Sequence, residues 1–144
     1  MYENIYFQLI GINMANISRP LSPHISIYRP QITSVLSILH RITGVALYVG
    51  LAVLIVFLGV VAYFPANYTM LHNLLISVLG KLFLFGWTLA FYFHFFNGIR
   101  HLFWDMGKGF DIPIVNKTGW AVLIFSVLAS VASWAVAYHN MGVL

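Results

Sequence analysis

Polar side chains occur at regular spacing inside one of the apolar runs of this sequence. His94, Gly98 and His101 stand at i, i+4 and i+7, so they share one face of a helix. Gly98 lacks a side chain and leaves space between the two imidazoles, where a flat molecule can approach the backbone. His94 precedes Trp104 by ten residues, about 15 Å of helix. A neutral imidazole so deep in an apolar run needs a partner, either a haem iron or a hydrogen bond to a neighbouring helix.

A second polar group lies near the start of the first apolar run. Ser37 and Arg41 stand at i and i+4 and share a helix face. An arginine can neutralise a carboxylate or donate to a carbonyl oxygen, and a serine hydroxyl can also donate, so the pair can hold the polar head of a lipid-like ligand. Snorkelling by Arg41 and ordinary helix packing by Ser37 are the alternative. His40 sits one residue round the helix and can face another neighbour, while Gly44 and Gly50 permit close helix contact.

The composition decides what kind of protein positions these residues. Hydrophobic residues make up 61% of the 144 residues and charged residues 7%, against about 45–50% and about 25% in an ordinary soluble domain. This balance excludes a soluble domain, a disordered chain and a coiled coil. The net charge of +4 is spread along the chain, which argues against nucleic-acid binding. Because the chain has no cysteine, it cannot form disulfides, thiolate zinc sites or its own iron–sulfur ligation.

Three long apolar runs predict an all-α integral membrane protein with three transmembrane helices. Each run reaches the roughly 20 residues that a helix needs to cross the hydrocarbon, and they span residues 35–64, 74–103 and 119–138. The first link is short and uncharged, and the second, residues 105–117, contains Gly107, Gly109 and Pro113 as helix breakers. Three prolines favour an extended segment on the membrane surface over residues 1–33. We therefore expect this segment to precede a transmembrane domain over residues 34–144.

The basic residues predict the orientation of the chain. They gather before or at the start of the first run and in the region between the second and third runs, at Arg19, Arg29, Arg41, Arg100, Lys108 and Lys117. Lys81 is the exception. The positive-inside bias places the N-terminus and the second link on the cytoplasmic or matrix side of an energy-transducing membrane. Because consecutive spans run in opposite directions, both polar groups then fall in the same half of the membrane.

Three sequence motifs resemble a known family. Residues 19–24 read Arg-Pro-Leu-Ser-Pro-His, residues 37–44 read Ser-Ile-Leu-His-Arg-Ile-Thr-Gly, and residues 94–105 begin His-Phe-Phe-Asn-Gly-Ile-Arg-His. Their order and placement are similar to the large cytochrome b membrane-anchor subunit of succinate dehydrogenase, respiratory complex II. The resemblance covers about residues 18–140.

The resemblance implies a fold, partners and a function. The three helices would pair with a second, small three-helix anchor subunit, with one haem b between the two subunits. His94 matches the axial haem ligand, and the partner would supply the other. Together the anchors would attach an iron–sulfur subunit and a flavoprotein subunit to the lipid membrane. Electrons would pass from succinate to ubiquinone in the respiratory chain and the tricarboxylic acid cycle, and the chain alone would not be catalytic.

The resemblance also implies roles for the remaining polar residues. Ser37 and Arg41 match residues that line the ubiquinone pocket. His40, Arg41 and His101 match positions near the haem propionates. Asp105 matches an acidic residue near the inner surface that assists quinone protonation.

Other functions compete with this interpretation. Fumarate reduction uses the same architecture with electrons flowing the other way. A structural anchor without a redox site would contain no haem. A small channel or transporter should present a polar stripe through the whole membrane, whereas the third run offers only Ser126, Ser130 and Ser133 as polar groups.

Overall fold

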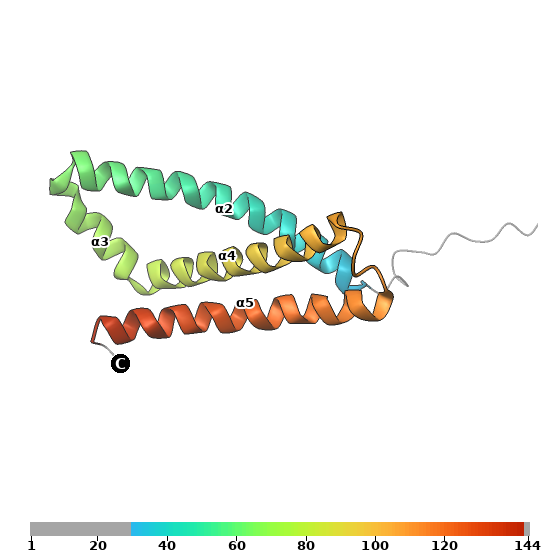
Figure 1. Cartoon of the computed structure of the whole chain (residues 1–144). Helices are drawn as coiled ribbons and strands as arrows, with labels where there is room; N and C mark the ends of the chain where they lie inside the picture. Colours follow the sequence, from blue (N-terminus) through green and yellow to red (C-terminus); the bar gives the residue numbers. More distant parts are fainter. Residues whose placement is uncertain (1–29, 143–144) are drawn as a thin grey trace, which may run out of the picture.

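The computed structural model describes residues 30–142, and this part of the chain is a bundle of helices (Figure 1). Three helices are long and apolar enough to cross a membrane: α2 (Ile32–Tyr63), α4 (Val78–Asp105) and α5 (Ile112–Asn140). Between α2 and α4 lie the short 3-10 helix η3 (Pro65–Asn67) and the short helix α3 (Tyr68–Ile76). The all-α prediction with three membrane-spanning helices is confirmed.

The long helices meet at a small core near one end of the bundle. Leu36 of α2, Phe93 of α4 and Val122 of α5 are buried against one another there. Gly119 permits this approach, because a Cβ at its position would lie 2.9 Å from Leu36 Cδ1. From this end α2 diverges from α4, whereas α5 runs alongside α4 (Figure 1). Most other large apolar side chains are exposed, as expected for helices that face lipid or another subunit.

Hydrogen bonds between polar side chains connect α4 to α5 along their length. The Tyr92 hydroxyl lies 2.6 Å from Ser133 Oγ, and Trp134 Nε1 donates to Thr88 Oγ1 at 3.2 Å. Ser126 and Ser130 are buried and donate instead to the carbonyl four residues earlier in α5. Because these two hydroxyls are used within their own helix, they do not supply the polar stripe that a channel requires.

The second membrane-spanning helix begins later than predicted. The sequence predicted one run over residues 74–103, but the chain turns sharply at Ser77 and α4 begins at Val78. Ser77 has an extended backbone, and its hydroxyl accepts a hydrogen bond from the Gly80 amide at 3.1 Å, which is the geometry of a helix N-cap. Gly80 packs directly on the carbonyls of Leu74 and Leu75. Residues 68–76 therefore form the separate helix α3, and the uncharged link is longer than expected.

The third helix is longer than its apolar run. α5 extends over Ile112–Asn140, whereas the sequence predicted residues 119–138. Pro113 lies in the first turn, where the missing amide hydrogen costs no hydrogen bond. Two of the three predicted breakers are confirmed, since Gly107 (φ 73°) and Gly109 (φ 81°) take the left-handed conformation that suits glycine, whereas Pro113 lies within α5. α5 therefore begins seven residues before the apolar run, within the predicted polar link.

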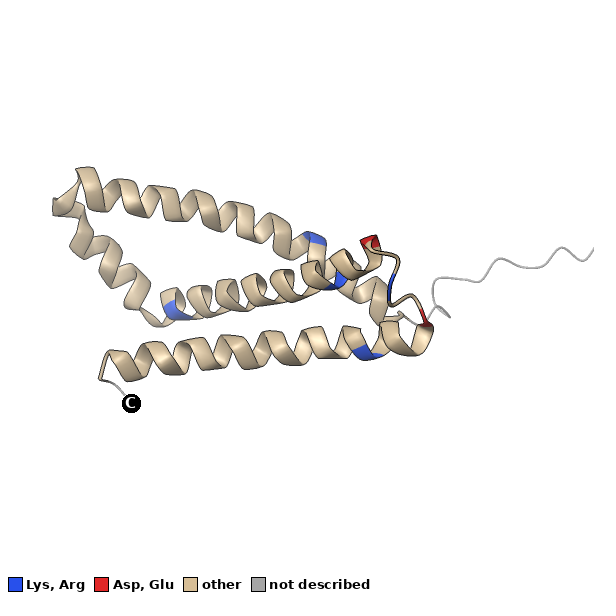
Figure 2. Ribbon diagram, in the orientation of Figure 1, with Lys and Arg blue, Asp and Glu red and all other residues tan. Residues whose placement is uncertain are grey.

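Charged residues gather at one end of the described bundle (Figure 2). They belong to the part of α2 that crosses α4, the last two turns of α4, the link after it and the first two turns of α5, and they are Arg41, Arg100, Asp105, Lys108, Asp111 and Lys117. Lys81, at the start of α4, lies at the other end. The charged end coincides with the end where α2 contacts α4 and α5, which is the arrangement predicted from the order of the basic residues. Arg19, Arg29 and most of the predicted surface segment over residues 1–33 lie outside the described residues, and α2 already begins at Ile32.

Candidate functional site

Three imidazoles come together where α2 crosses α4. The ring of His40 stacks on the ring of His94 with centroids 3.9 Å apart and planes 7° from parallel. The His101 ring lies 5.1 Å from the His40 ring. His40 thus faces α4, which the sequence left open, and its ring contacts the two imidazoles that share one face of α4. We call these three residues the histidine cluster.

Two groups on α2 lie within hydrogen-bond distance of Nδ1 of the His94 ring. His94 Nδ1 lies 3.1 Å from the carbonyl oxygen of His40 and 3.2 Å from Oγ1 of Thr43. The Thr43 hydroxyl donates its own hydrogen to the carbonyls of Leu39 (2.8 Å) or His40 (3.0 Å), so it faces His94 with a lone pair. Both neighbours of Nδ1 are therefore acceptors, which places the ring hydrogen on Nδ1. The Nε2 lone pair of His94 makes no hydrogen bond within residues 30–142.

Two glycines shape the space around the His94 ring. A Cβ at Gly44 would lie 3.1 Å from His94 Cε1, a tight contact that would push the ring away slightly, so the glycine helps α2 approach the ring closely. A Cβ at Gly98 would meet nothing within 4 Å, so the surface beside the cluster is open there. The close contact predicted at Gly44 is confirmed, and Gly50 makes a second one against the Trp87 indole.

Ser37 and Arg41 flank His40 on the segment of α2 that crosses α4. Ser37 is half-buried and Arg41 is exposed. Neither side chain makes a hydrogen bond to another residue in the described range of 30–142. Asp105 is exposed at the last residue of α4, one turn beyond His101. All the predicted site residues thus lie in the half of the bundle that has the charged end, and among them only the three histidines contact one another.

Sequence reasoning found Arg100 in the motif over residues 94–105 but not its contacts. Its side chain is 6% exposed and reaches from α4 to α5, where it donates to Thr118 Oγ1 and to the Val115 carbonyl, both at 3.1 Å. The guanidinium carbon also lies 4.1 Å above the centre of the Trp104 ring. Asn97, which is fully buried, accepts a longer hydrogen bond from Arg100 at 3.5 Å. Arg100 therefore joins two helices on the side of α4 away from His94.

The described residues do not form a complete metal site. No group of three or more His, Cys, Asp or Glu side chains within residues 30–142 is arranged to hold a metal ion. Within the histidine cluster, His94 has one nitrogen, Nδ1, in contact with hydrogen-bonding groups of α2. Its other nitrogen, Nε2, makes no hydrogen bond within residues 30–142. The residues present therefore fit a haem that takes a single axial ligand from this chain.

Comparison with known proteins identifies the family. Residues 15–133 match the succinate dehydrogenase/fumarate reductase transmembrane subunit family. The chain belongs to this family. Among its members, the succinate dehydrogenase cytochrome b556 subunit of Rickettsia bellii is 48% identical over 116 residues, which cover 81% of this chain and 90% of the relative. The resemblance inferred from the motifs is confirmed.

Two succinate dehydrogenase cytochrome b560 subunits are also similar to this chain. The succinate dehydrogenase cytochrome b560 subunit of Reclinomonas americana is 36% identical over 136 residues, covering 91% of this chain and 94% of the relative. The mitochondrial cytochrome b560 subunit of Sus scrofa is 42% identical over 120 residues, covering 79% and 69%. The chain is thus a cytochrome b membrane-anchor subunit of succinate dehydrogenase, and it contributes to the enzyme as a subunit without being catalytic alone.

Proposed function

We propose that His94 binds the iron of a haem b through Nε2 and that Ser37 and Arg41 form part of a ubiquinone site in the same complex. The small anchor subunit supplies the second axial ligand. The iron–sulfur and flavoprotein subunits dock at the charged end of the bundle, on the cytoplasmic or matrix side. The chain thereby helps electrons from succinate oxidation reach ubiquinone.

The observation that carries the haem proposal is the hydrogen bonding of His94 Nδ1. Histidines that bind metals usually donate the hydrogen of their other nitrogen to a carbonyl, a carboxylate or water, which fixes the tautomer and orients the ring. His94 makes this contact with the His40 carbonyl and with Thr43. When bound, a haem would supply a one-electron carrier beside the quinone site. The role of this chain is to hold the His94 ring in the tautomer whose Nε2 carries no hydrogen and can bind the iron.

The rest of the cluster supports a position for the haem propionates. His40 Nδ1 is buried and has no hydrogen-bond partner within residues 30–142. An unpaired buried polar atom costs about 1–3 kcal/mol, so a group from outside these residues is expected to complete this side of the cluster. The propionates of a bound haem could accept hydrogen bonds from His40 and His101 and would be attracted by the positive charge of Arg41. These three residues are therefore the ones that we expect to hold them.

The quinone proposal rests on the exposed cation beside the cluster. Arg41 and Ser37 present hydrogen-bond donors on α2, one helical turn apart, at the membrane half that contains the histidines. Donors of this kind hold a quinone carbonyl oxygen and stabilise the charge that develops as the ring is reduced. Asp105, exposed at the end of α4, is placed to pass a proton from the aqueous side. The small anchor and iron–sulfur subunits complete the site.

The haem assignment is tested by the reduced-minus-oxidised visible spectrum of the purified complex. Replacing His94 by glutamine should remove or strongly alter the low-spin absorption band. Replacing His139, which is exposed at the far end of α5, by glutamine is the matched control and should leave the band as in the wild type. An unchanged band in the His94→Gln complex would remove this residue from the ligand role. A wild-type complex without haem would favour a purely structural anchor.

The quinone assignment is tested by two activities of one variant complex. Arg41→Ala removes a charge-assisted hydrogen bond, which is worth about 1.5–3 kcal/mol. We expect kcat/KM for ubiquinone to fall by at least about tenfold, while succinate oxidation with an artificial acceptor stays unchanged. Lys117→Ala, which removes an exposed cation from the same end, controls for the loss of surface charge. Wild-type values of both activities in Arg41→Ala would refute the assignment.

Fumarate reduction would use the same residues with reversed electron flow. Because the relatives compared above are named succinate dehydrogenase subunits, succinate oxidation is the direction that we propose. Comparing the two rates of one purified complex decides between the directions.

A further inference from the structure

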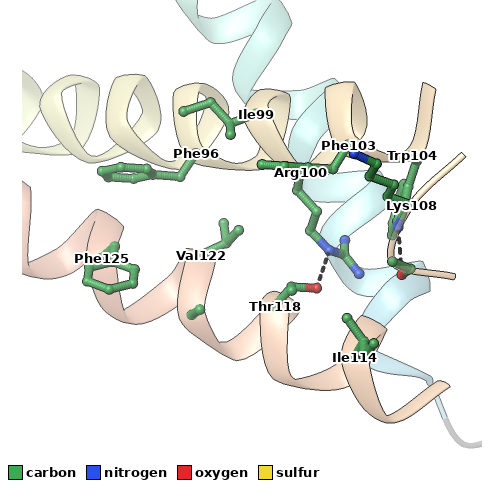
Figure 3. A pocket seen from close by; sticks show the side chains of 12 residues that line it. Phe96, Ile99, Arg100, Phe103, Trp104, Lys108, Ile114, Thr118, Val122 and Phe125 are labelled. Carbon is green, nitrogen blue, oxygen red and sulfur yellow. Dashed lines mark hydrogen bonds between the residues drawn. The ribbon is translucent and has the colours of Figure 1, made fainter. Parts of the chain in front are cut away.

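A pocket between α4 and α5 opens on the face of α4 that is turned away from His94 (Figure 3). Phe96, Ile99 and Phe103 line it, and they stand roughly 140–200° around the helix from His94 at about 100° per residue. The pocket has a volume of about 430 Å³, and its wall is almost entirely apolar. One of its lining residues, Trp104, also contacts the histidine cluster through the His101 ring, 5.1 Å away, so the pocket adjoins the cluster at one end and extends away from it.

The charged residues that line this pocket are both cations. Arg100 is nearly buried, and its hydrogen bonds within residues 30–142 go to neutral acceptors. Lys108 is exposed and lies in the link between α4 and α5. Figure 3 shows Lys108 and Trp104 at one end of the pocket and the rings of Phe96 and Phe125 at the other. The pocket thus combines an apolar groove with a positive mouth at the membrane surface.

We propose that this pocket binds one anionic phospholipid. The headgroup phosphate lies at the Lys108 ammonium, within the positive field of Arg100, and an acyl chain packs along Phe96 and Phe125. Cations at a membrane surface attract acidic lipids, and the pocket lies at the charged end of the bundle. A neutral ligand would leave the charge of Arg100 without a counter-ion in apolar surroundings, which is costly.

The position of the pocket favours a lipid over a protein segment. In the proposed function the small anchor subunit covers the histidine face of α4 and the iron–sulfur and flavoprotein subunits dock beyond the charged end, which leaves the apolar groove between α4 and α5 to the membrane. This one step rests on the proposed function, and the visible spectrum tests that function separately. The lipid proposal itself is measured by lipid binding and does not require haem.

The test places the whole purified complex in phosphatidylcholine nanodiscs that contain a minor fraction of spin-labelled phosphatidylglycerol. The spectrum of the label separates lipid immobilised on the protein from free lipid. Lys108→Gln should lower the preference for phosphatidylglycerol about fivefold, the effect of one lysine near an acidic surface. Lys117→Gln, which removes a cation at the same end that does not line the pocket, is the matched control. Equal preferences in the two variants would overturn the proposal.

Two further variants test where the lipid lies. Ala121→Trp fills the pocket from α5, so it should reduce the immobilised phosphatidylglycerol by the equivalent of one molecule per complex. A photo-crosslinking side chain at Phe103 should attach to phospholipid, which mass spectrometry detects. Attachment to another subunit instead, or full retention of the immobilised lipid in Ala121→Trp, would refute this site.

Discussion

Replacing Thr43 by valine tests how α2 orients the His94 ring. Valine keeps the shape of threonine and removes the hydroxyl that lies 3.2 Å from His94 Nδ1. Loss of a hydrogen-bond partner behind a metal ligand typically costs 10–100-fold in metal affinity. The His40 carbonyl, at 3.1 Å, still accepts from Nδ1 in the variant. We therefore expect the lower end of the range, about a tenfold loss of haem affinity or ~1.4 kcal/mol.

The assay measures how fast haem leaves the purified complex for an excess of apomyoglobin. Thr43→Val should release haem about tenfold faster than the wild type, and its low-spin spectrum should shift because the ring is less firmly oriented. Thr43→Ser keeps a hydroxyl at this position and should behave like the wild type. If Thr43→Val retained haem as well as Thr43→Ser, the hydroxyl would have no role in holding His94. His94→Gln, which should lose the band itself, separates this outcome from failure of the haem assignment.

Two predictions concern the packing of the helices. Gly50→Ala should lower the free energy of unfolding of the complex by about 1–3 kcal/mol, because its Cβ would overlap the Trp87 indole. Thermal denaturation measures the change, and a midpoint temperature equal to that of the wild type would show that α2 and α4 separate there without cost. Tyr92→Phe removes the contact with Ser133 and should cost about 0.6 kcal/mol, a typical value for a hydrogen bond between membrane helices. Denaturation in detergent measures this loss of stability, and Tyr138→Phe is the control. If Tyr92→Phe lost no more stability than Tyr138→Phe, the prediction would be contradicted.

The parts of the fold that hydropathy controls were predictable from the sequence. Leaving backbone N–H and C=O groups unpaired in hydrocarbon is so costly that an apolar run long enough to cross the membrane is expected to form a helix. The i, i+4, i+7 spacing placed His94 and His101 on one face for the same geometric reason. The end of α3 was not predictable in this way, because Ser77 ends it by a local cap and serine occurs inside membrane helices as well.

The contacts between helices were harder to predict than the helices themselves. Thr43 carries no signal of its own, since a threonine in a membrane helix usually donates to its own backbone, and here it does so while also facing His94. Its role depends on the depth at which α2 crosses α4, which Gly44 sets. The partners of Arg100 likewise depend on which face of α5 turns toward α4. Helix association in a membrane is governed by shape and by interhelical hydrogen bonds, and hydropathy does not encode either.

The connection that Arg100 makes between α4 and α5 has a consequence for a protein in an energy-transducing membrane. Such a membrane keeps its two sides at different acidity. A guanidinium stays protonated at the pH values found there, and its acceptors within residues 30–142 are a hydroxyl, an amide oxygen and a backbone carbonyl. None of these acceptors gains or loses a proton in that range. The junction of the two helices is therefore insulated from the proton gradient, and it stays the same whether the membrane is energised or at rest.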